Sequence, residues 1–123
     1  MTVNDEPNGI GAREREQLQA LALANAVRLA IADVRVEVKS GSLSVRAALD
    51  DERAAHMTVF QLLAAQHRWG PYRTVAALEL VKLPERKRVL ELTARQQELV
   101  VAVAEGRSRE ELKELISHGF PGF

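Results

Sequence analysis

The chain has no cysteine, few aromatic residues and no long uncharged run. The absence of cysteine excludes a disulfide framework and a thiolate metal site. Aromatic residues are 4% of the chain although hydrophobic residues are 46%, so Leu, Val and Ala must build the core, as they usually do in helical bundles. The longest stretch without Lys, Arg, Asp or Glu runs from Ala54 to His67, which is too short and too polar to span a bilayer. No basic segment followed by an apolar run opens the sequence. We therefore expect a soluble cytoplasmic protein.

A balanced total charge conceals a basic segment. The 17 Lys and Arg match the 17 Asp and Glu among the 123 residues, a length that predicts one domain. Residues 57–95 nevertheless hold seven basic residues and only three acidic ones, Glu79, Glu85 and Glu91. A local excess of positive charge on a neutral protein suits a phosphate polymer as partner.

A long helix is predicted over residues 12–40, after a flexible leader of residues 1–11 that is rich in Asn, Asp, Pro and Gly. One apolar stripe with spacings of three and four consists of Leu23, Val27, Ile31, Val34 and Val38. Other apolar residues lie off this stripe: Leu18, Leu21, Leu29 and Val36. A helix with two apolar faces needs two sets of partners. Its own domain supplies both sets, or the second face meets something else.

The end of this helix has an alternative interpretation. Val34, Val36 and Val38 alternate strictly, and a turn at Ser40-Gly41 could close a hairpin. A lysine shortly before a glycine suits a helix C-terminus instead. We favour the helix.

Residues 41–123 predict a small domain of short helices, so the whole chain is predicted to be all-α. Helix start signals are Ser44, Thr58, Pro71 after Gly70, Thr93 with Gln96, and Ser108 with Glu111. The expected helices end near Leu49, Gln66, Pro84, Glu105 and Ser117. The expected inward residues are Val59, Leu62, Leu63, Val75, Leu78 and Val81. Phe120 and Phe123 in the tail either pack against the domain or stay exposed to solvent.

No catalytic pattern is present. His56, His67 and His118 are isolated, and neither a phosphate-binding glycine loop nor a Ser-His-Asp order occurs. The acidic run Asp50-Asp51-Glu52 could bind a hard cation, although a linker after a short helix explains it as well. We expect a protein that is not an enzyme and needs no cofactor or metal.

Three groups of residues are candidates for binding an anion. Arg68, Gly70 and Arg73 surround a turn between two helices, where a helix N-terminus and bidentate arginines can hold an oxygen. Trp69 and Tyr72 in the same turn are equally suited to plug the core. Lys87 and Arg88 form a second basic turn, which could grip phosphates or simply be solvated. Arg28, Arg35 and Lys39 share one face of the long helix, with Asp33 and Glu37 nearby.

Several segments together resemble the actinobacterial integration host factor family. The matching segments are Gly41-Ser42-Leu43, Met57-Thr58-Val59, Leu62-Leu63, Gly70, Val81-Lys82-Leu83, Arg86-Lys87-Arg88-Val89 and Leu92. The match is ungapped from Met57 to Gln96 and looser from about Arg28. The resemblance implies a helix–two-turn–helix domain shared with a small-subunit ribosomal protein.

The same resemblance implies a nucleoid-associated protein that binds double-stranded DNA mainly through its backbone, without sequence specificity. The glycine of the DNA-contacting turn would be Gly70, and the later basic pair would be Lys87 and Arg88. The charges of a lid helix would be Arg28, Arg35 and Lys39. The ribosomal relative keeps RNA binding open as a further option.

The sequence also departs from the family pattern. Arg68 stands where the family has a glycine, Pro71 where it has a lysine, Leu90 where a basic residue is expected, and Glu91 where a glycine is expected. The lid helix is apolar where the family has many Arg and Lys. Each lost phosphate contact lowers the salt dependence of binding by about one unit. The alternative function is therefore a helical protein–protein interaction or homo-oligomer module that kept the fold and lost most DNA affinity.

Overall fold

The computed structural model describes residues 11–118, which form a long helix and a domain of short helices. The long helix is α1 (Ala12–Ser40). The domain contains α2 (Val45–Leu49), η1 (Glu52–Ala54), α3 (Val59–Ala64), α4 (Pro71–Leu80), η2 (Val89–Glu91), α5 (Ala94–Ala104) and α6 (Arg109–His118). Within residues 11–118 there is no strand, only an isolated bridge between Thr58 and Arg88. The predicted all-α fold with a long N-terminal helix is confirmed. The leader up to residue 10 and the tail with Phe120 and Phe123 lie outside the described residues.

Side-chain hydroxyls start four helices of the domain, as the sequence predicts. The oxygens of Ser44, Thr58, Thr93 and Ser108 each accept a hydrogen bond from the backbone N–H three residues later, at 3.1–3.2 Å. This hydrogen bond satisfies a helix N–H group that has no partner within the helix. The two short helical turns η1 and η2 were not predicted, and α3 ends at Ala64 rather than near Gln66.

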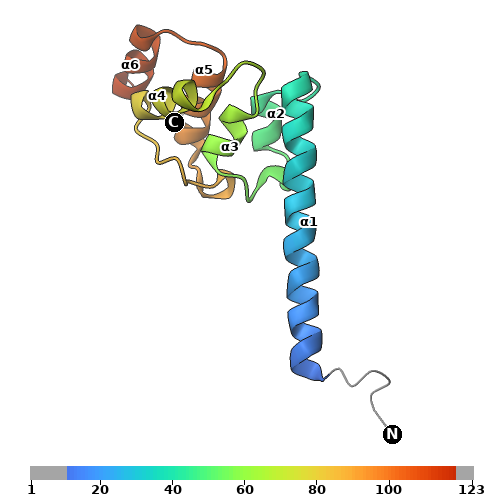
Figure 1. Cartoon of the computed structure of the whole chain (residues 1–123). Coiled ribbons are helices and arrows are strands. Elements are labelled where there is room, and N and C mark those ends of the chain that lie inside the picture. The colour runs from blue at the N-terminus through green and yellow to red at the C-terminus, as the bar shows by residue number, and fades with distance from the viewer. Residues whose placement is uncertain (1–10, 119–123) are drawn as a thin grey trace, which may run out of the picture.

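The domain holds α1 near one end only. Val34 and Val38 are buried in the core and Ile31 is partly buried against it, whereas Leu23 on the same stripe is 69% exposed. Figure 1 shows the domain against the C-terminal part of α1, while the N-terminal part projects beyond it. The helix is 29 residues long, which corresponds to about 43 Å. The interpretation that its own domain covers both faces is therefore wrong.

The C-terminus of α1 rules out the hairpin alternative. The helix continues to Ser40 and ends at Gly41, whose φ of 85° is left-handed and whose N–H donates to the carbonyl oxygen of Val38. Glycine adopts this conformation without the steric cost that a side chain brings. The alternating valines thus belong to a helix.

An ion-pair cluster ties α1 to the domain beside the buried valines. The Arg53 guanidinium donates to both carboxylate oxygens of Glu37, at 2.7 and 2.9 Å, and also to the carboxylate of Asp51. Hydrogen bonds from Arg53 lower the pKa of Glu37 and the pKa of Asp51. Within the acidic run at residues 50–52, it is therefore Asp51 that pairs with Arg53. Within residues 11–118 no three His, Asp or Glu side chains gather into a metal site.

The core lies between the short helices. Its largest fully buried side chains include Met57, Leu62, Leu63, Leu78 and Leu112. Two predicted core residues differ: Val75 is only half-buried, and Tyr72 is 90% exposed. Thr74 is buried in their place, and its hydroxyl donates to the Gly70 carbonyl oxygen at 3.0 Å. Among the described helices, none has the length and apolar character that a membrane crossing requires.

The Arg53 cluster predicts a pH-dependent stability. Because Glu37 and Asp51 have lowered pKa values in the folded state, their contribution is present above the unfolded values of about 4 and is lost as the pH falls through the folded values. The free energy of unfolding of wild type should therefore exceed that of Arg53→Met most above about pH 5. The difference should shrink in acid, as measured by urea unfolding followed by circular dichroism.

Arg46→Met is the matched control, because Arg46 pairs with Glu98 at 3.4 Å and its side chain is more exposed than that of Arg53. A pH-independent difference between wild type and Arg53→Met would contradict the role given to this cluster.

Candidate functional site

A groove of about 670 Å³ opens between α1 and the turn that joins α3 to α4. One wall is the C-terminal part of α1, and the other comprises residues 64–70. Its charged lining residues are Arg35, Lys39 and Arg68, and none of its lining residues is Asp or Glu. We call this feature the basic groove. Gly70 lines the basic groove as well. The groove therefore brings together predicted site residues from two segments that lie about thirty positions apart in the sequence.

Arg68 has an unusual backbone conformation in the turn. Its φ of 66° is left-handed, which non-glycine residues rarely adopt. Such strain, of order 1–3 kcal/mol, persists only where the surrounding structure holds it. The following N–H, that of Trp69, donates to the Gln66 carbonyl oxygen at 3.1 Å. The turn therefore presents Arg68 to the groove from a constrained backbone.

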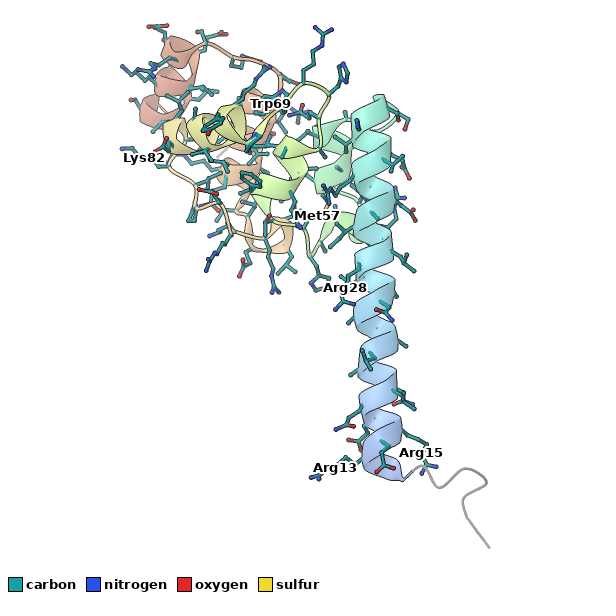
Figure 2. All side chains as sticks on the ribbon, in the orientation of Figure 1. Arg13, Arg15, Arg28, Met57, Trp69 and Lys82 are labelled. Atoms are coloured by element: carbon teal, nitrogen blue, oxygen red, sulfur yellow. The ribbon has the colours of Figure 1, made fainter. Side chains whose placement is uncertain are left out.

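Trp69 forms part of the groove lining and also of the core. Its side chain is 9% exposed, which confirms that it plugs the core. The Arg73 guanidinium lies over its ring, 4.3 Å from the ring centroid, within the range of a cation–π interaction. Figure 2 labels Trp69 in the upper part of the domain, level with the upper end of α1. The indole thus fixes Arg73 beside the turn.

The helix α4 begins at the groove without a side-chain cap. Gly70 is its N-cap residue and Pro71 its first residue, so neither supplies a capping oxygen. Within the described part of the chain, no backbone or side-chain acceptor takes the N–H of Tyr72 or of Arg73. The other α-helices of the domain start with a hydroxyl cap. These free amides and the helix dipole favour a negatively charged group at Gly70.

Arg28 extends the row of positive charge along α1. It lies seven residues before Arg35 on the same side of the helix, at about 10 Å along the axis. It does not line the groove, and its guanidinium donates to Asn25 Oδ1 at 2.7 Å. Figure 2 places Arg28 on the stretch of α1 just beyond the domain.

Lys87 and Arg88 lie away from the basic groove. The Lys87 carbonyl oxygen accepts the Val59 N–H at the start of α3, whereas the groove begins at Ala64 at its end. The Arg88 N–H donates to the Glu91 carboxylate at 2.9 Å, which places negative charge beside this turn. The structure therefore separates the predicted site residues into two basic clusters.

Two groove residues were missed as binding candidates from the sequence. Gln66 and His67 line the basic groove, and with Lys39 and Trp69 they also line an adjacent hollow of about 730 Å³ that contains Glu105. In the sequence, His67 is an isolated histidine without a second metal ligand at helical spacing. Its position directly before Arg68 in the same turn was the available signal.

Comparison with known protein families, with curated proteins and with solved structures finds no match to this chain. These comparisons therefore give no support to the resemblance to the integration host factor family, which stays an expectation.

The basic groove predicts a difference in the quenching of Trp69, the only tryptophan in the chain. A positive potential concentrates anions and repels cations. Measured relative to the quenching of free tryptophan by each ion, iodide should therefore quench Trp69 fluorescence about twofold more efficiently than caesium at equal ionic strength. Arg35→Gln with Lys39→Gln should reduce this ratio, and Lys87→Gln with Arg88→Gln should leave it unchanged. Equal quenching of wild type by both ions would contradict the electrostatic description of the groove.

Proposed function

We propose that this protein binds double-stranded DNA through the phosphate backbone, with the basic groove as its principal contact and without sequence specificity. The observation that carries the proposal is the convergence of Arg35, Lys39 and Arg68 on an uncapped helix N-terminus in a groove without carboxylates. Phosphate oxygens need positive charge and N–H donors together, and this arrangement supplies both.

Each part of the groove has a distinct role in this proposal. The N–H groups of Tyr72 and Arg73 donate to one phosphate oxygen at the start of α4. Arg68 and Arg35 approach the same strand from opposite walls and can hold oxygens bidentately. Arg28, two helical turns further along α1, meets the backbone where the duplex leaves the domain. These contacts carry no base information, so affinity and not sequence selectivity is expected.

The backbone of Arg68 supports the resemblance on which this proposal partly rests. The resemblance puts a glycine at this position, and a left-handed φ is the conformation that glycine adopts at least cost. Arg68 keeps that backbone and adds a cation. A nucleoid-associated role follows from the proposal, with DNA as the partner and the nucleoid as the location.

Lys87 and Arg88 are proposed as a second, separate phosphate contact. They stand at the far end of α3 from the groove, and α3 has six residues, about 9 Å. A contact on this turn would be weakened by Glu91, whose carboxylate the Arg88 N–H already engages.

The test is a titration of a labelled duplex of about two helical turns at several salt concentrations. Affinity should fall steeply as salt rises, since each neutralised phosphate contributes about one unit to the slope. Arg35→Gln with Arg68→Gln should flatten the slope by about two units. Lys87→Gln with Arg88→Gln is the matched double variant and should flatten it less. No binding at low salt would refute the proposal.

Substitutions at Gly70 can distinguish an effect on DNA binding from an effect on stability. Its φ of −78° is ordinary for an N-cap residue, and a Cβ there would meet no atom within 4 Å. Gly70→Asp and Gly70→Asn should both keep the fold and gain a few tenths of a kcal/mol as helix caps. Gly70→Asp should lose far more DNA affinity than Gly70→Asn, because only the carboxylate repels phosphate. Equal affinity of the two variants would remove Gly70 from the site.

The alternative function, a protein-interaction module, is favoured by one observation. Leucines on the projecting part of α1, such as Leu18 and Leu29, are more than half exposed. Exposed apolar residues that gather on one element mark an interaction surface. This surface is compatible with DNA binding, since it lies mainly outside the groove.

A further inference from the structure

α1 carries a second apolar row on the face opposite the buried Val34 and Val38, and the last two residues of this row, Ala32 and Val36, also line the basic groove. The row consists of Leu18, Ala22, Asn25, Leu29, Ala32 and Val36, with alternating spacings of four and three. All six residues are exposed, with Leu29 and Val36 each at 67%. A regular 4-3 alternation averages 3.5 residues, the repeat of a coiled coil. We call these six residues the heptad row.

The heptad row is independent of the contact between α1 and its own domain. At 3.6 residues per turn, Leu18 and Val36 lie on the same side of the helix, half a turn from Val34 and Val38. Val34 and Val38 are buried by the domain. A partner can therefore cover the heptad row without displacing the core, and at Ala32 and Val36 it would also cover part of the α1 wall of the basic groove.

We propose that the partner on the heptad row is a second copy of this chain, bound as a parallel coiled-coil dimer. In a parallel pair each residue of the row faces its own counterpart across the twofold axis. Ala22 and Ala32 let the helices approach closely, while Leu18, Leu29 and Val36 fill the layers between. The two domains sit on the outer sides of the pair, because each is attached to the opposite face of its own helix.

Charge complementarity favours the parallel pair. Arg28 precedes Leu29 and Asp33 follows Ala32, so these two residues flank the row on opposite sides. In a parallel coiled coil, Arg28 of one copy reaches Asp33 of the other, and symmetry makes this pair twice. Asp33 forms no ion pair within residues 11–118, while Arg28 donates only to Asn25.

The polar residue in the row points to the same orientation. In a parallel dimer Asn25 meets Asn25, and two side-chain amides can hydrogen-bond each other and fix the register. In the antiparallel arrangement that aligns Leu18 with Val36, Asn25 would meet Leu29, and Arg28 would lie against Arg28. Both contacts are unfavourable. Arg15 and Lys39 occupy the next positions of the repeat and end the apolar row.

The proposal is tested without nucleic acid, so its outcome is independent of the proposed DNA binding. Wild type should show a concentration-dependent mass that approaches twice 13.6 kDa in sedimentation equilibrium. Leu18→Glu with Leu29→Glu should give a monomer with unchanged far-UV circular dichroism of the domain. Leu23→Glu is the matched control, because Leu23 is 69% exposed on the same helix but lies outside the row.

Two results would overturn the dimer. The first is a monomer at every concentration up to about 1 mM, the upper end of measurable dissociation constants for such contacts. The second is a loss of the dimer in Leu23→Glu equal to that in the double variant.

Orientation is tested by disulfide formation, for which the absence of native cysteine provides a clean background. Ala22→Cys alone should form a covalent dimer under mild oxidation if the helices are parallel. In the antiparallel pair each Ala22 would meet Ala32, about 15 Å along the helix from Ala22 itself. Cross-linking that requires a mixture of Ala22→Cys and Ala32→Cys would overturn the parallel arrangement.

Discussion

The attachment of α1 by one end is the constraint on which the rest of the structure depends. Burial of Val34 and Val38 removes apolar surface from water, and the Arg53 hydrogen bonds to Glu37 fix the helix beside that contact. Because this contact ends near Ile31, the same helix does two things. Its C-terminal part forms one wall of the basic groove, and its N-terminal part projects with both faces uncovered. The proposed site and the proposed dimer surface both follow from this one contact.

The groove wall opposite α1 depends on the absence of a side-chain cap at the start of α4. Four other helices of the domain satisfy their first N–H groups with a hydroxyl, whereas Gly70 and Pro71 supply none. An uncapped helix start surrounded by carboxylates would be an ordinary surface feature. Here the left-handed backbone of Arg68 and the stacking of Arg73 on Trp69 place cations around it. Unsatisfied donors and positive charge therefore coincide at a single place.

Local sequence signals predicted most of the helices, and long-range contacts account for what they missed. The hydroxyl caps and Gly41 fixed where helices begin and end, because capping depends on residues within one turn. The sequence does not predict the role of Arg53, because its partner Glu37 lies 16 residues earlier in the chain. Tyr72 was expected to share the core with Trp69. Which side of this turn is buried depends instead on the segments that pack against α4 in the folded domain. Likewise, the sequence predicts Lys87 and Arg88 as a second basic turn, and only the packing of α3 shows that this turn lies away from the groove.

The contact between DNA and the basic groove can be followed residue by residue through the shift of backbone amide resonances when a short duplex is added to isotopically labelled protein. The largest shifts are expected at Gly70, Tyr72 and Arg73, with smaller ones at Arg35 and Lys39 on the facing wall. These shifts should reverse when salt is added, since counterions compete for the same phosphates. Shifts confined to residues 87–91, or none at low salt, would contradict the assignment of the groove as the DNA contact.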